Sequence, residues 1–186
     1  MALIADHTIT ALVQDKPGVL ARVASMFSRR GFNISNLVVG HSEKAHLSRM
    51  SFDVEGDEWV VEQVTKQLYK LIDVVDVTDI SSDSIVVREL ALIKVKSSSE
   101  TRAQIIQTVD IFKADIIDVA DDAVIVEVTG DGEKVDPLLK LLEPFGIQEI
   151  MRTGRVAMTR GELASGAKKA QLADVDHNAP DTEVVP

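Results

Sequence analysis

The residues that come nearest to a chemical site form a short loop before a predicted helix. Gly18 permits a ligand to approach the backbone closely. The first N–H groups of a helix have no partner within it and lie at the positive end of its dipole, so they attract small anions such as the carboxylate of an amino acid. The ligand's ammonium could meet the carboxylate of Asp15. An aliphatic side chain could lie on Val19, Leu20 or Ile34. The alternative is a plain strand-to-helix turn, which the loop taken by itself favours.

No other group of residues is typical of catalysis or metal binding. The four histidines show no ligand spacing, and His41 and His46, which flank a predicted hairpin turn, are expected to be solvated. Asp121 and Asp122 are adjacent in a predicted turn, where neighbouring side chains point apart, so acid–base chemistry is not expected. The Walker, G-x-S-x-G and G-x-G-x-x-G motifs are missing. We therefore expect no catalytic residue, no metal site and no cofactor on this chain.

The elements that must position the loop follow a βαββαβ order. Residues 9–13 are predicted to form a buried strand, after which Pro17 enters the first turn of a helix that Gly31 caps. The apolar face of this helix is expected to hold Val19, Leu20, Val23 and Phe27, with Arg22 facing away. Strands are expected at 34–39 and 50–54, and apolar residues alternate with polar ones in the second of them. A second amphipathic helix and a fourth strand complete the pattern. The apolar positions of that helix are Val61, Val64, Leu68 and Leu71, and the strand covers residues 74–77.

The second half of the chain repeats this pattern. A constant offset carries residues 56–57, Gly-Asp, onto 130–131, which are also Gly-Asp, and keeps the four apolar helix positions apolar. The strand 89–95 and the next helix match the first strand and helix at a larger offset, which implies a shorter central hairpin. We predict an α+β fold of two ferredoxin-like βαββαβ domains in tandem. Their boundaries are expected at 1–80 and 85–161, with a linker at 81–84.

Composition excludes several classes of partner. The chain has 186 residues, 45% of them hydrophobic, so it can form a core, but its formal charge of −10 repels phosphate backbones. No apolar run approaches the roughly 20 residues that span a bilayer. Cysteine is absent, and no export signal begins the chain. We expect a cytoplasmic protein that binds neither nucleic acid nor membrane. Residues 162–186 lose all periodicity, so a disordered tail is expected there.

Two runs of residues around the loop resemble the opening of an ACT domain. They are 15–23, DKPGVLARV, and 27–34, FSRRGFNI. Further runs in both halves are similar to the small subunit of acetohydroxyacid synthase, also called acetolactate synthase. They include 47–50 LSRM, 88–95 RELALIKV, 111–114 IFKA and 144–147 PFGI. The resemblance covers residues 7–161, and agreement across both halves is far more specific than a single ACT module, which accompanies many functions.

The resemblance implies a regulatory subunit and not an enzyme. Its N-terminal ACT domains would pair in a homodimer, continue their sheets across the interface, and hold valine or another branched-chain amino acid between the protomers. Thiamine diphosphate, FAD and magnesium are then expected on a catalytic large subunit, which this chain would stimulate and make sensitive to feedback inhibition. The effector-binding residues that the resemblance implies are Asp15, Gly18, Val19, Leu20, Asn33, Ile34 and Gly40.

Asp15 departs from the family pattern, since many valine-sensitive members carry asparagine at this position. A carboxylate keeps the hydrogen-bond acceptor but loses the N–H donor and adds charge, which leaves effector preference and potency open. One alternative function is a free-standing tandem ACT sensor of amino acids that controls a transcriptional regulator. Another is a small ferredoxin-like hydrolase, but Lys16 and Arg22 do not form a convincing anion-activating arrangement.

Overall fold

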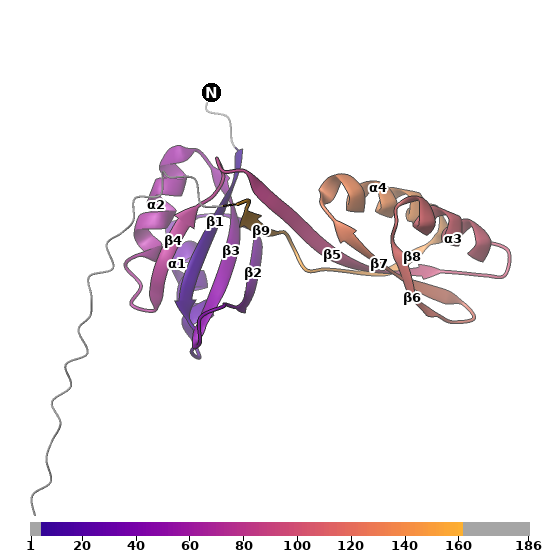
Figure 1. Cartoon of the computed structure of the whole chain (residues 1–186), viewed down its shortest axis with the longest axis horizontal. Helices are drawn as coiled ribbons and strands as arrows, with labels where there is room; N and C mark the ends of the chain where they lie inside the picture. The colour runs from indigo at the N-terminus through magenta and orange to yellow at the C-terminus, as the bar shows by residue number, and fades with distance from the viewer. Residues whose placement is uncertain (1–4, 162–186) are drawn as a thin grey trace, which may run out of the picture.

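The computed structural model describes residues 5–161, which form two similar units of strands and helices joined by a long strand (Figure 1). The predicted tail at 162–186 lies outside the described residues. The first unit contains β1 (Ala5–Gln14), α1 (Val19–Arg30), β2 (Ile34–His41), β3 (Leu47–Gly56), α2 (Glu58–Leu68) and β4 (Val74–Asp79). The second contains β5 (Ile85–Lys96), α3 (Arg102–Ile111), β6 (Asp115–Val119), β7 (Ala123–Gly130), α4 (Gly132–Leu142), the 3-10 turn η1 (Glu143–Phe145), β8 (Ile147–Arg152) and β9 (Val156–Thr159).

The predicted duplication is visible in the topology of the two sheets. Both are antiparallel, with strand order β2-β3-β1-β4 in the first unit and the equivalent order β6-β7-β5-β8 in the second. The repeated Gly-Asp pairs have the same role, since Asp57 and Asp131 are the N-caps of α2 and α4. Each side chain accepts a hydrogen bond from a backbone N–H three residues on, at 3.0 Å from Val60 and 3.2 Å from Lys134. The α+β fold of two βαββαβ units is therefore confirmed.

The core of each unit lies between one face of its sheet and its two helices (Figure 1). In the first unit the rings of Phe27 on α1 and Phe52 on β3 are both buried, with centroids 5.3 Å apart. The predicted apolar face of α1 is correct at Val19, Val23 and Phe27, but Leu20 is 46% exposed. Met26 takes the fourth buried position, because it lies one turn from Val23 on the same face.

Strand β5 begins beside the first unit and continues into the second sheet (Figure 1). Its residues 85–88 pair with β9 in a two-stranded ribbon, and residues 89–96 form the centre of the second sheet. Figure 1 shows this ribbon beside the first unit, where the Thr8 N–H donates to Ser81 Oγ at 3.0 Å. The tandem arrangement predicted from the sequence did not include this ribbon. Two segments therefore cross between the units, β5 and the stretch that precedes β9.

Candidate functional site

The predicted anion loop lies between the C-terminal end of β1 and the start of α1. Gly18 is the N-cap of α1 and has a left-handed conformation, with φ 86° and ψ −8°. Pro17 therefore precedes the N-cap, and the prediction that it enters the first helical turn is wrong by two positions. Glycine is required here because L-residues rarely adopt a positive φ.

The start of α1 leaves backbone donors free. Val19 donates its N–H to Lys16 O at 3.3 Å, and Arg22 donates to Gly18 O at 3.0 Å. Within residues 5–161, no acceptor is found for the N–H groups of Leu20 and Ala21. No side chain caps the helix, and no acidic residue lies in its first turn. This end of α1 can therefore accept a carboxylate without displacing an existing partner.

Asp15 lies beside this helix start and against the hairpin between β2 and β3. Its N–H donates to His46 O at 2.9 Å, and its Oδ2 lies 3.3 Å from His41 Nδ1. The His41 side chain is 88% exposed, in agreement with the solvated histidine that was predicted. The Asp15 carboxylate remains 46% exposed, so it is available to an ammonium group approaching from solvent.

Arg22 is a charged residue near the loop, and the sequence pattern predicted no part for it in effector binding. Its guanidinium binds the largely buried carboxylate of Asp73, with Nε and Nη2 both 2.7 Å from Oδ2. A Cβ added to Gly18 would lie 3.4 Å from Arg22 Nη1. The spacing of four residues between Gly18 and Arg22 was a usable signal, because residues one turn apart share a helix face.

The predicted effector residues fall into two groups within one chain. Asp15, Gly18 and Leu20 lie at one end of α1, and Asn33 lies past its other end, about 18 Å away for a helix of this length. Strand β2 connects the same two ends, since it begins at Ile34 and reaches Gly40 about 20 Å later. The strand register confirms that the two groups lie at opposite ends of the sheet. Gly40 and Leu12 both pair with Arg49 at the end near the loop, whereas Ile34 and His7 both pair with Val54 at the other end.

Side-chain exposure differs within the group at the loop. Val19 is 3% exposed and belongs to the core, and its N–H already donates to Lys16 O, so neither its side chain nor its N–H is available to a ligand. The Leu20 side chain is nearly half exposed and is the apolar surface available beside the free N–H groups. Asn33 is exposed and Ile34 is half-buried at the other end.

Two other classes of site are not found in the part of the chain that the structure describes. Residues 5–161 hold no group of three or more histidine, cysteine or acidic side chains arranged to bind a metal ion. Over the same residues, none of the helices combines the length and the apolar character needed to span a membrane.

Comparison with known proteins agrees with this architecture. Residues 9–76 match the family described as the AHAS small subunit-like ACT domain, and residues 88–161 match the family described as the small subunit of acetolactate synthase. The acetolactate synthase small subunit of Mycolicibacterium smegmatis is 50% identical over 163 residues, which are 88% of this chain and 96% of that protein. A probable acetolactate synthase small subunit of Methanothermobacter thermautotrophicus is 54% identical over 156 residues, 83% of this chain and 93% of that protein.

A solved structure extends the agreement to three dimensions. The crystal structure of the acetolactate synthase small subunit from Thermotoga maritima superposes with a TM-score of 0.81 at 45% identity. The superposition covers 86% of this chain and the whole of that one, at 100%. Sequence and fold therefore agree over both units, and this chain belongs to the family of acetolactate synthase small subunits.

Proposed function

We propose that this chain is a cytoplasmic regulatory subunit that senses valine or another branched-chain amino acid and adjusts the activity of the acetolactate synthase catalytic subunit. The observation that carries the proposal is the uncapped start of α1. There, a left-handed Gly18 precedes the free N–H groups of Leu20 and Ala21, and the half-exposed carboxylate of Asp15 belongs to the same loop. A zwitterion needs donors for its carboxylate and an acceptor for its ammonium, and this loop carries both kinds of group.

The apolar part of the effector would lie on Leu20. That side chain is exposed next to the free N–H groups, and a branched aliphatic group would remove part of its surface from water. Discrimination by one methylene group is worth about 1–3 kcal/mol in an apolar pocket, so preference among valine, leucine and isoleucine would be modest. Arg22 adds positive charge near the carboxylate, although Asp73 already neutralises most of it.

A second protomer would bring the two groups of predicted residues together. If two β2 strands pair antiparallel about a two-fold axis, the start of one lies beside the end of the other. The partner's Asn33 and Ile34 then approach Gly40 and the Gly18 loop. The edge strands of the first sheet are β2 and β4. On β4 the Tyr69 hydroxyl already bonds the outward N–H and C=O of Val77, at 3.2 and 3.0 Å, so β2 is the edge better suited to pair with a second protomer.

Regulation follows from this geometry by linkage. An effector held between two β2 strands favours the dimer arrangement that binds it best, and that arrangement would stimulate the catalytic subunit less. A coupling of about 1–3 kcal/mol changes partner activity several-fold. The chemistry would take place on the large subunit with thiamine diphosphate, FAD and magnesium, and this chain would contribute no catalytic residue.

Calorimetry of the purified chain with valine, leucine and isoleucine tests the proposal directly. Saturable binding of at least one of them is expected, together with a dimeric mass in solution. Added to its catalytic subunit, the chain should raise acetolactate production, and the bound amino acid should reverse that increase. Copurification with a transcriptional regulator in place of a thiamine enzyme would favour the free-standing sensor. Absence of binding by all three amino acids would contradict the site.

A further inference from the structure

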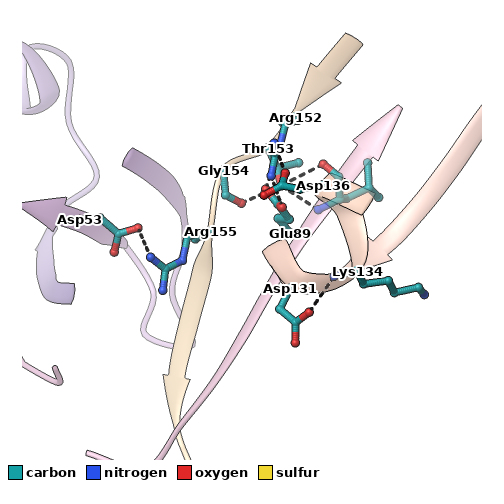
Figure 2. A network of polar contacts seen from close by, with 10 residues as sticks. Asp53, Glu89, Asp131, Lys134, Asp136, Arg152, Thr153, Gly154 and Arg155 are labelled. Atoms are coloured by element: carbon teal, nitrogen blue, oxygen red, sulfur yellow. Dashed lines mark hydrogen bonds and ion pairs between the residues drawn. The ribbon is translucent and has the colours of Figure 1, made fainter. Parts of the chain in front are cut away.

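A short segment between β8 and β9, residues 152–155, contacts both units of the chain (Figure 2). Its first residue is held by the second unit. Arg152 donates from Nε to the buried carboxylate of Glu89 at 3.1 Å, forms an ion pair with the same group through Nη2, and donates from Nη1 to Asp136 at 2.9 Å. Thr153 then exchanges hydrogen bonds with the Leu90 backbone. The N-terminal end of the segment is therefore fixed to the second sheet.

The other end of the segment is held by the first unit. The backbone carbonyl of Arg155 accepts a hydrogen bond from Asn36 Nδ2 at 2.8 Å, and its guanidinium Nη1 lies 3.5 Å from Asp53 Oδ2. The backbone of Gly154 lies so close to β2 that a Cβ at this position would collide with Asn36 Oδ1. Figure 2 shows Arg155 directed toward Asp53 and Arg152 directed away, toward Glu89 and Asp136.

Asp53 makes this contact energetically significant. The residue is 1% exposed on β3, and Thr8 Oγ1 donates to its Oδ1 at 2.8 Å. Its Oδ2 receives no hydrogen bond from the described residues. Within residues 5–161, Arg155 is the only cation in ion-pair range of this carboxylate. A buried charge is strongly unfavourable unless it is paired, so the position of Arg155 matters to the first sheet.

We propose that residues 152–155 form a clamp that sets the orientation of the second unit relative to the first, with Asp53–Arg155 as its releasable contact. The two ends differ in how firmly they are held. Arg152 binds two carboxylates, one of them buried, whereas Arg155 is 42% exposed and makes a 3.5 Å ion pair without a hydrogen bond to Oδ2. The Arg155 side chain therefore has fewer contacts to break than that of Arg152.

The clamp also lies next to the strand that carries the proposed dimer contact. Asn36 on β2 pairs with Asp53 on β3, and both bind Arg155. A shift of β2 would therefore directly change the contacts of Arg155 with Asn36 and Asp53, with no intervening residue. This coupling of effector to orientation rests on the proposed function, whereas the clamp itself depends only on contacts within one chain.

Distance measurements between the two units test the clamp. The chain has no cysteine, so Lys70→Cys and Lys140→Cys, at exposed positions in the first and second unit, carry one spin label each. Full-length labelled chain is diluted with unlabelled chain so that only intrachain distances are recorded. Double electron–electron resonance should give a narrow distribution for the parent protein, and Arg155→Ala should make it about twofold broader. An unchanged distribution would overturn the proposal.

A matched control separates the clamp from a general loss of positive charge. Arg88→Ala removes an exposed arginine of β5 whose guanidinium donates to the carbonyl of the adjacent Val87. This variant should keep the narrow distribution, and an equal broadening would contradict a specific role for Arg155. Because Arg155→Ala leaves Asp53 unpaired and could impair folding, Asp53→Asn/Arg155→Ala provides a second test. It removes both charges, should unfold at a temperature near that of the parent, and should show the same broad distribution; a narrow one would refute the clamp.

Adding valine distinguishes the clamp from the effector site. The distances recorded without valine test the clamp even if no amino acid binds. If valine binds, it should shift the distribution of the parent protein and not that of Arg155→Ala, although calorimetry should show that Arg155→Ala still binds valine. An equal shift in both chains would show that the effector signal bypasses Arg155.

Discussion

Substitution of Gly18 by aspartate tests the effector loop most directly, because strain and charge act at one position. The φ of +86° is unfavourable for any L-residue by about 1–2 kcal/mol. For a chain of this size, that strain lowers the melting temperature by about 2–8 °C. The new carboxylate would also stand at the start of α1, where the effector carboxylate is proposed to bind. At about 4 Å, two such charges repel by about 1 kcal/mol in water and about 4 kcal/mol at an effective dielectric of 20.

The predicted loss of valine affinity for Gly18→Asp is therefore between about 5-fold and about 1000-fold. Calorimetry measures it, and a thermal melt of the same sample reports the strain separately. Gly146→Asp is the matched control, since Gly146 has φ +95° and lies in the second unit with no atom closer than 3.6 Å to an added Cβ. It should lose comparable stability and keep valine binding. Parent-like affinity in Gly18→Asp, or equal loss of affinity in both variants, would refute the assignment of the loop.

Three further predictions concern the duplicated scaffold and its edge. Leu68→Ala and Leu142→Ala truncate equivalent, fully buried side chains and should each cost about 2–5 kcal/mol in urea unfolding; a cost below about 1 kcal/mol at either site would contradict equivalent cores. Asp57→Ala and Asp131→Ala remove matching N-caps, so each should lose about 1 kcal/mol by the same assay, and a neutral effect would show that the cap is dispensable. Burial, and then the nearby negative charge of Asp76, raise the pKa of Tyr69 above its usual value of about 10. The folded state therefore retains this proton longer than the unfolded state, and its contribution is complete below pH about 10 and lost as the pH rises further. Tyr69→Phe should weaken that alkaline loss in pH-dependent melts, and an identical profile would contradict the assignment.

Local patterns in the chain were sufficient to predict the duplicated βαββαβ order and the ends of several elements. Apolar periodicity identifies a strand or helix because both repeat over a few residues. Gly31 was recognisable as a helix cap because glycine readily adopts the left-handed conformation in which many helices end. The Gly-Asp repeat aligned the two halves of the chain, and the structure shows that Asp57 and Asp131 are equivalent N-caps. Periodicity was less reliable at the edge of a helix face, where it grouped Leu20 with the apolar residues of α1 although that side chain is nearly half exposed.

Contacts between distant residues could be established only from the folded chain. Asn36 and Arg155 are separated by 119 positions, and the pairing of Asp53 with Arg155 depends on the ribbon that returns to the first unit. The same is true of the separation between Asn33 and the Gly18 loop, which follows from the length of α1 and the register of β2. A sequence pattern records which side chains share a face of one element, whereas the packing of whole elements decides which faces meet.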